Sequence, residues 1–170
     1  MTYQERPGTA LAQLRETLVS EIREYHGLIR LTRRQNRFMR RQSLVELDAL
    51  TRAWEVRRPM ADGSRNRRLE AQERAARVLQ LPADTSLTQI IRTGGMMTSE
   101  LESLRLSHRK AVEALARQNE LNGRLARFCL DLIAGEANAL RVGINNAAGG
   151  TYDGRGAMAA GSGSVVVRQA

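Results

Sequence analysis

The sequence predicts an all-α protein: an elongated antiparallel three-helix bundle with coiled-coil character, followed by a disordered C-terminal tail. Aromatic residues make up only 4% of the 170 residues, so the core must rest on aliphatic side chains, which suits helix-on-helix packing. Apolar residues recur at steps of three and four over long stretches. From residue 149 onward glycine, alanine and serine dominate, and such a composition buries too little apolar surface to stay ordered.

The first helix is expected over residues 9–42, after the break at Pro7 and Gly8. At about 100° per residue its apolar positions fall on one narrow stripe. The stripe consists of Leu11, Leu14, Leu18, Ile22, Tyr25, Ile29, Thr32, Asn36 and Met39.

The second helix is expected over residues 43–80. Ser43, with a glutamate three residues later, has the pattern of a capping box. Pro59 removes a backbone donor and Gly63 is a poor residue inside a helix. We therefore predict a kink or a break near residues 59–64.

A short helical turn in residues 83–95 leads to the third helix, expected over residues 98–146. This helix is too long to be stable by itself, so it must pack on the other two. The bundle would then occupy residues 1–148 and the tail residues 149–170. The main stripe of the third helix is Leu101, Leu104, His108, Val112, Leu115, Asn119, Asn122, Ala126, Cys129, Ile133, Leu140 and Ile144.

The later part of the third helix carries a second apolar row, about a quarter to a third of a turn from the first. This row is Leu121, Leu125, Phe128 and Leu132. Either the protein's own helices or a dimer partner cover it, or it is a docking surface for an amphipathic helix of another protein. The polar residues of the main stripe, His108, Asn119 and Asn122, either fix the helix register or contact a partner.

The net charge is +9 and rests almost entirely on arginine, since Lys110 is the only lysine. One group of arginines follows the first helix, and a second group consists of Arg65, Arg67 and Arg68. These arginines either form a solvated face with acidic neighbours on adjacent helices or bind phosphates. Nucleic acid is the weaker expectation because residues for base stacking are scarce. The first group is Arg30, Arg33, Arg34, Arg37, Arg40 and Arg41.

Neither a catalytic site nor a metal or cofactor site is expected. Cys129 lies on an apolar helix face, which favours an inert thiol, and His26 and His108 have no second ligand at metal-binding spacing. The N-terminus lacks the pattern of a signal peptide. No stretch reaches the ~20 apolar residues that would span a bilayer. We therefore expect a cytoplasmic protein without membrane insertion.

The stretches "LPADTSLTQII", "QNELNGRLARFCLDLI" and "TYDGRGAM" together resemble the FlgN family of flagellar type III export chaperones. "LPADTSLTQII" is similar to the family's turn before its last long helix. "QNELNGRLARFCLDLI" is similar to a segment in which two asparagines precede a leucine-rich run. "TYDGRGAM", followed by "GSGSVVVRQA", is similar to the family's tyrosine- and glycine-containing tail.

The resemblance implies a non-enzymatic chaperone of the hook–filament junction proteins FlgK and FlgL. Such chaperones bind the helical C-terminal region of the client and deliver it to the export gate protein FlhA. The implied client surface is Leu121, Leu125, Phe128 and Leu132, with Asn119 and Asn122. The residues implied in docking to the gate are Tyr152, Asp153 and Gly156. A homodimer is possible when no client is bound.

Two alternatives stay open at the level of the sequence. The protein could be an arginine-rich helical nucleic-acid-binding protein, since export chaperones tend to be acidic and this chain is strongly basic. It could also be a structural coiled-coil subunit, for which tight self-association without a client is expected.

Overall fold

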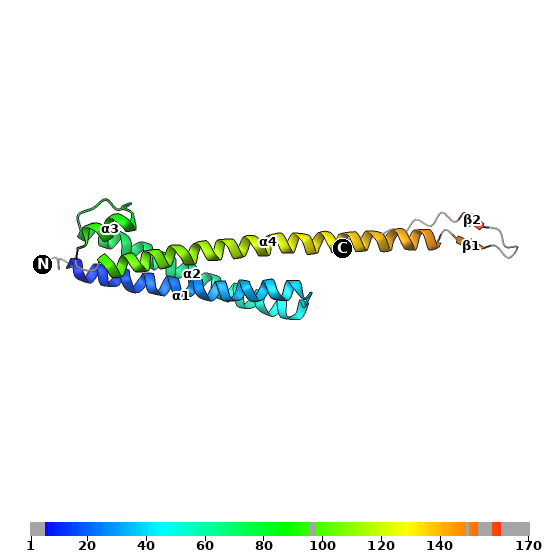
Figure 1. The fold of residues 1–170 in the computed structure, drawn as a ribbon, viewed down its shortest axis with the longest axis horizontal. Coiled ribbons are helices and arrows are strands. Elements are labelled where there is room, and N and C mark those ends of the chain that lie inside the picture. The colour runs from blue at the N-terminus through cyan, green and yellow to red at the C-terminus, as the bar shows by residue number, and fades with distance from the viewer. Residues whose placement is uncertain (1–5, 96–97, 149, 153–157, 161–170) are drawn as a thin grey trace. The chain divides into compact units, whose positions relative to one another are not determined.

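The computed structural model describes residues 6–95, 98–148, 150–152 and 158–160. These residues form four helices and two short strands, in the order α1, α2, α3, α4, β1 and β2 (Figure 1). The all-helical class predicted from the sequence is therefore confirmed in its main elements. Residue contacts divide the chain into a first unit, residues 1–125, and a second unit, residues 126–170. The division falls inside α4, whereas the sequence had suggested a boundary at residue 149.

In the first unit, α1 (Pro7–Arg40) and α2 (Leu44–Val78) lie side by side and antiparallel. Pro7 occupies the first turn of α1, where a missing N–H does no harm. The antiparallel direction follows from the contacts between the two helices, because the residue numbers of the partners rise along α2 as they fall along α1. These pairs are Glu24 with Arg57, Glu21 with Arg68, and Gln13 with Arg74.

The first part of α4 (Thr98–Ala148) runs parallel to α1. The residue numbers of the contacting partners rise along both helices, and Figure 1 shows the two helices next to each other. The pairs are Arg15 with Glu100, Glu21 with His108, and Asn36 with Asn122. α1, α2 and the first part of α4 thus enclose a common interior.

The hydrophobic core lies where all four helices meet. Leucines come from α1 and α4, isoleucines from α3 (Leu87–Thr93), and alanines from α2. The alanines allow α2 to approach closely, and each buried leucine contributes about 2 kcal/mol. The core residues are Ala10, Leu11, Leu14, Leu18, Ala71, Ala75, Ala76, Ile90, Ile91 and Leu101.

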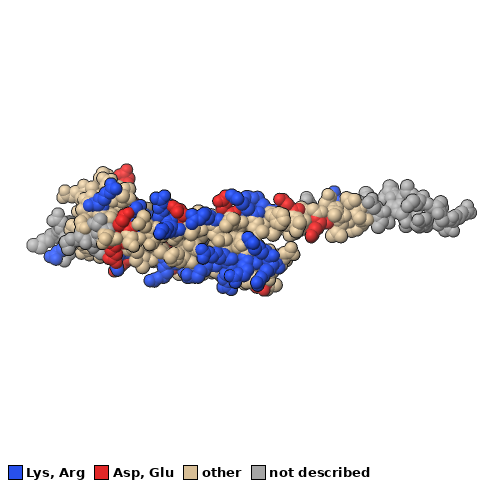
Figure 2. All heavy atoms as spheres, viewed as in Figure 1, with Lys and Arg blue, Asp and Glu red and all other residues tan. Residues whose placement is uncertain are grey.

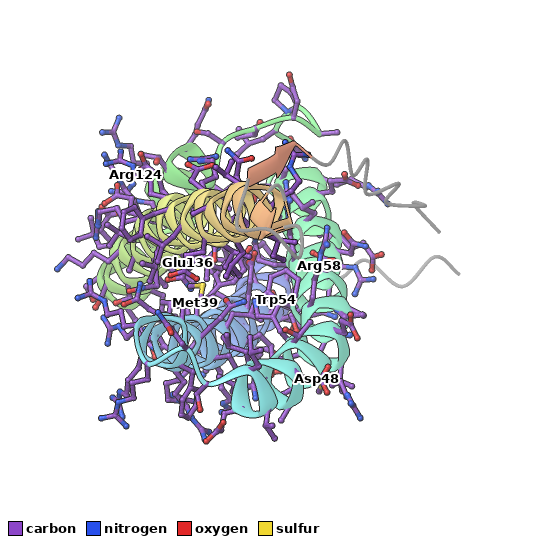
Figure 3. All side chains as sticks on the ribbon, turned by 90° about the vertical axis from the view of Figure 1, so that its right-hand side faces the viewer. Met39, Asp48, Trp54, Arg58, Arg124 and Glu136 are labelled. Carbon is purple, nitrogen blue, oxygen red and sulfur yellow. The ribbon has the colours of Figure 1, made fainter. Side chains whose placement is uncertain are left out.

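The break expected near residues 59–64 does not occur, because α2 is one continuous helix with Pro59 inside it. The proline leaves the carbonyl of Glu55 without its helical donor. Both residues are exposed, so water can supply the missing hydrogen bond. Beside them the guanidinium of Arg58 lies 5.4 Å from the ring centre of Trp54, and both side chains are labelled in Figure 3.

The helix ends differ in part from the expected caps. Ser43 is the N-cap residue of α2, but its hydroxyl bonds to the carboxylate of Glu46 and caps no backbone N–H. The short helix α3 has the better cap, because the Ser86 hydroxyl accepts a hydrogen bond from the Gln89 backbone N–H. At its other end Gly94 packs so tightly that a Cβ would lie 2.8 Å from Leu11.

The second unit contains the rest of α4 and a two-stranded antiparallel hairpin. The strands are β1 (Gly150–Tyr152) and β2 (Met158–Ala160), with Thr151 opposite Ala159. These six residues differ from the disordered tail that the sequence predicted. An isolated pair of strands of this length is only marginally stable.

Candidate functional site

A buried carboxylate joins the three long helices of the first unit. Glu21 of α1 is 0% exposed. Arg68 of α2 donates to it over 2.9 Å, and Nε2 of His108 of α4 lies 3.1 Å from the same oxygen. Tyr25 donates its hydroxyl to the other oxygen over 2.8 Å. These groups lock the relative positions of α1, α2 and α4 at one level of the first unit.

The protonation of this cluster follows from its contacts. Burial alone would raise the pKa of Glu21, but the contact with His108 and the hydrogen bonds from Arg68 and Tyr25 lower that pKa to about 2. Burial and the neighbouring carboxylate raise the pKa of Tyr25 to about 12. Glu21 is therefore ionised and Tyr25 is neutral at physiological pH.

A second polar contact lies further along the α1–α4 interface. Asn122 is 7% exposed, and its amide donates to the backbone carbonyl of Thr32 over 2.8 Å. The same amide donates to Gln35, and the Asn122 oxygen accepts from Asn36 and Gln118. The hydrogen-bonding capacity of this side chain is used within the chain. The structure therefore supports the interpretation that Asn122 fixes the helix register.

The apolar row predicted on α4 lies on both sides of the unit boundary. In the first unit Leu121 is 54% exposed and Leu125 is half-buried. In the second unit Phe128 is 63% and Leu132 is 43% exposed. Asn119, which the sequence placed on the packed stripe, is exposed as well.

The second unit exposes more apolar side chains than the sequence indicated. We call the exposed large apolar side chains of residues 126–144 the apolar segment of α4. On a helical wheel they spread over well more than half of the circumference, so a single helix laid along α4 could not cover them all. They are Phe128, Leu130, Leu132, Ile133, Leu140, Val142 and Ile144.

Helical periodicity could not reveal this exposure. Ile133, Leu140 and Ile144 continue the stripe that packs on α1 earlier in α4, so their spacing predicts burial. The last hydrogen bond between α1 and α4 joins Asn36 to Asn122, and α1 ends at Arg40. The spacing of apolar residues predicts which face of α4 is apolar, but it does not predict how far α1 extends along that face.

The tail residues proposed for gate docking are described only in part. Tyr152 is the last residue of β1, and its backbone is opposite Met158. Asp153 and Gly156 lie outside the described residues.

Other candidate sites find little support within the described part of the chain. No group of three or more His, Cys, Asp or Glu side chains is placed there to hold a metal ion. Cys129, which the sequence places on an apolar helix face as an inert thiol, is a free thiol and is half-buried. No helix in the described ranges is both long and apolar enough to cross a membrane.

The fold and the exposed segment define a class: helical proteins whose last long helix exposes large apolar side chains. The FlgN family model, described as FlgN protein, matches residues 1–160. The chain therefore belongs to the FlgN family, which indicates a flagellar export chaperone. No significant match to a curated protein or to a solved structure was found.

Proposed function

We propose that this protein is a cytoplasmic chaperone of type III flagellar export that binds hook–filament junction proteins of the FlgK and FlgL type. The observation that carries the proposal is the apolar segment of α4, which is exposed in a chain of the FlgN family. A monomer rarely exposes so many large apolar side chains along one helix without a partner to cover them. The helical C-terminal region of a junction protein is the partner that the family resemblance implies.

The client surface is the row Leu121, Leu125, Phe128 and Leu132, continued by the rest of the apolar segment. An amphipathic helix of the client would lay its apolar face on this row. Burying a side chain such as Phe128 or Leu132 stabilises the complex by about 1.5–3 kcal/mol. Asn119 is exposed and would contribute a polar contact, whereas the burial of Asn122 removes it from the proposed surface.

The first unit serves as the scaffold of this surface. We propose that α1, α2 and α4 form an antiparallel three-helix bundle with coiled-coil character, in line with the paired polar contacts of Glu21 and Asn122. In the absence of a client, two copies could cover their apolar segments by forming a homodimer.

The tail is proposed to present the loaded chaperone to an export gate protein of the FlhA type. Tyr152 would be the anchoring side chain, with Asp153 and Gly156 shaping the turn beside it. A tether that joins two weak contacts raises the effective concentration of the second contact, so neither contact needs to be strong.

Co-purification with the C-terminal region of a junction protein tests the client surface. Phe128→Glu should abolish co-purification, because it places a charge in the middle of the apolar contact. The matched control is Val56→Glu, which changes an equally exposed apolar residue of α2 outside the surface. Circular dichroism should show full helicity for both variants. Undiminished client binding by Phe128→Glu would rule out this surface.

A further inference from the structure

The arginines of the second half of α1 have no acidic partner among the described residues. All six side chains are exposed, and among them only the Arg40 guanidinium makes a hydrogen bond, to the side chain of Asn36. Several arginines elsewhere are paired with carboxylates, for example Arg109 with Glu113 and Arg124 with Glu120. Acidic neighbours on adjacent helices, one of the expectations from the sequence, are therefore not found here. The unpaired group is Arg30, Arg33, Arg34, Arg37, Arg40 and Arg41.

This concentration of like charge opposes folding, because the cations repel one another along a single helix face. Basic side chains gather over this end of α1 in the space-filling view (Figure 2). An unpaired group of this kind is a favourable surface for an anionic partner, which would remove the repulsion on binding.

A groove between α1 and α4 adjoins these arginines. It has a volume of about 340 Å³ and is lined by residues of both helices. Its apolar lining is Ile29 and Ala111, which are buried, and the half-buried Ala114. Its basic lining is exposed and consists of His26, Arg30, Arg33 and Lys110. No acidic residue lines the groove.

We propose that this groove binds an acidic amphipathic segment of a partner protein. Aliphatic side chains of the segment would rest on Ile29, Ala111 and Ala114, while its carboxylates pair with Arg30, Arg33 and Lys110. Guanidinium groups suit this role because they bind carboxylates through two parallel hydrogen bonds.

The lining of the groove favours a peptide over a nucleic acid. Single-stranded nucleic acid binds most strongly where bases stack on aromatic rings, and the groove offers no phenylalanine, tyrosine or tryptophan. Three aliphatic side chains between basic residues match a peptide that carries both leucines and glutamates. The groove shares no residue with the proposed client surface, so the two sites can be tested separately.

Fluorescence anisotropy of the full chain tests the proposal with three probes at low and at moderate salt. The first is a synthetic helical peptide with glutamates on one face and leucines beside them. The second replaces the leucines with serines, and the third is a poly-uridine oligonucleotide of similar length. The leucine-containing peptide should bind most tightly, because only it uses both the apolar and the basic lining.

The double variant Arg30→Gln and Arg33→Gln should weaken binding of the first peptide by ~tenfold or more, which corresponds to about 1.4 kcal/mol. The control, Arg52→Gln with Arg58→Gln, removes the same amount of charge from α2. It should leave the affinity for the peptide within ~twofold, because salt screens most of the interaction between distant charges. Ala114→Glu, which supplies a carboxylate within the groove, should also abolish peptide binding.

Three results would overturn the proposal. The first is absence of peptide binding at low salt. The second is equal affinity for the leucine and serine peptides, which would mean that the apolar lining is not used. The third is that poly-uridine binds more tightly than the leucine-containing peptide and loses this binding in the double variant Arg30→Gln and Arg33→Gln. That result would make this surface a nucleic-acid site.

Discussion

At the scale of single residues, the first unit depends on one charged group in an otherwise apolar interior. Glu21 is fully buried, and taking an isolated carboxylate out of water is very unfavourable. Arg68, His108 and Tyr25 compensate for the lost hydration with three contacts of 2.8–3.1 Å. Because these partners come from three helices, the carboxylate selects one arrangement of those helices over others.

Replacing this carboxylate should destabilise the first unit strongly. Glu21→Gln leaves the largely buried Arg68 without its counter-charge, and breaking a buried pair in this way costs about 3–5 kcal/mol. The control Glu120→Gln disrupts the exposed pair with Arg124 and should change stability by less than about 0.5 kcal/mol. Urea denaturation of both variants measures the two differences. Similar midpoints for the two variants would show that the buried cluster contributes little.

The same cluster predicts a dependence of stability on pH. The pKa of Glu21 is lowered from 4.5 to about 2 in the folded protein, so its contribution is fully present above 4.5 and is lost as the pH falls towards 2. The difference in the free energy of unfolding between wild type and Glu21→Gln should be constant above pH 4.5 and should become smaller as the pH falls below 4.5. A gap that stays unchanged in acid would contradict the assignment.

Sequence reasoning identified some of these residues but not the central one. His108 and Asn122 stood out as polar positions on an apolar stripe, and both contact α1 in the structure. Glu21 was not identified, because a glutamate between apolar positions of a charged helix looks like any solvated residue. Its burial depends on Arg68, which is distant in sequence, and no local pattern connects the two.

At the scale of helices, α2 shows how tertiary packing overrides a local rule. Pro59 predicted an interruption, yet the helix passes through it without a break. Leu50 and Ala61 are buried on either side of the proline, so packing holds both halves in one helix. Helix existence was thus predictable from apolar spacing, whereas the effect of one residue within the helix was not.

Removing this proline should stabilise the protein. Pro59→Ala restores the backbone N–H that the Glu55 carbonyl lacks, and a proline inside a helix costs up to about 3 kcal/mol relative to alanine. The gain should appear as a higher thermal midpoint with unchanged helical content at low temperature. A lower midpoint would show that the proline makes packing contacts that alanine cannot replace.

At the scale of the whole molecule, the buried core and the apolar segment of α4 belong to different parts of the chain. Every large apolar side chain buried among the described residues lies before Leu104, in the first unit, while the apolar segment of α4 lies in the second. The periodicity of α4 continues through both units, so the sequence offered no sign of a boundary at residue 125. The apolar row itself was predictable, and its extension over residues 126–144 required the structure.

A chain that ends at Leu125 should therefore fold as well as the full chain. Trp54, the only tryptophan, lies in the first unit and reports its unfolding by fluorescence. The urea midpoints of the truncated and full chains should coincide, and only the full chain should bind the client. A clearly lower midpoint for the truncated chain would mean that residues after 125 stabilise the first unit.

The exposure of the apolar segment also has a consequence for how tightly a guest can be held. Residues 131–144 of α4 are all exposed, so this stretch gains little stability from tertiary packing. Gly135 and Gly143, which have open space around them, weaken the helix further. We therefore expect this part of the helix to be less stable than the first unit, so that a client bound here would have to stabilise it. Ordering the helix would offset part of the free energy of client binding. The proposed complex can therefore dissociate quickly although its apolar contact is large.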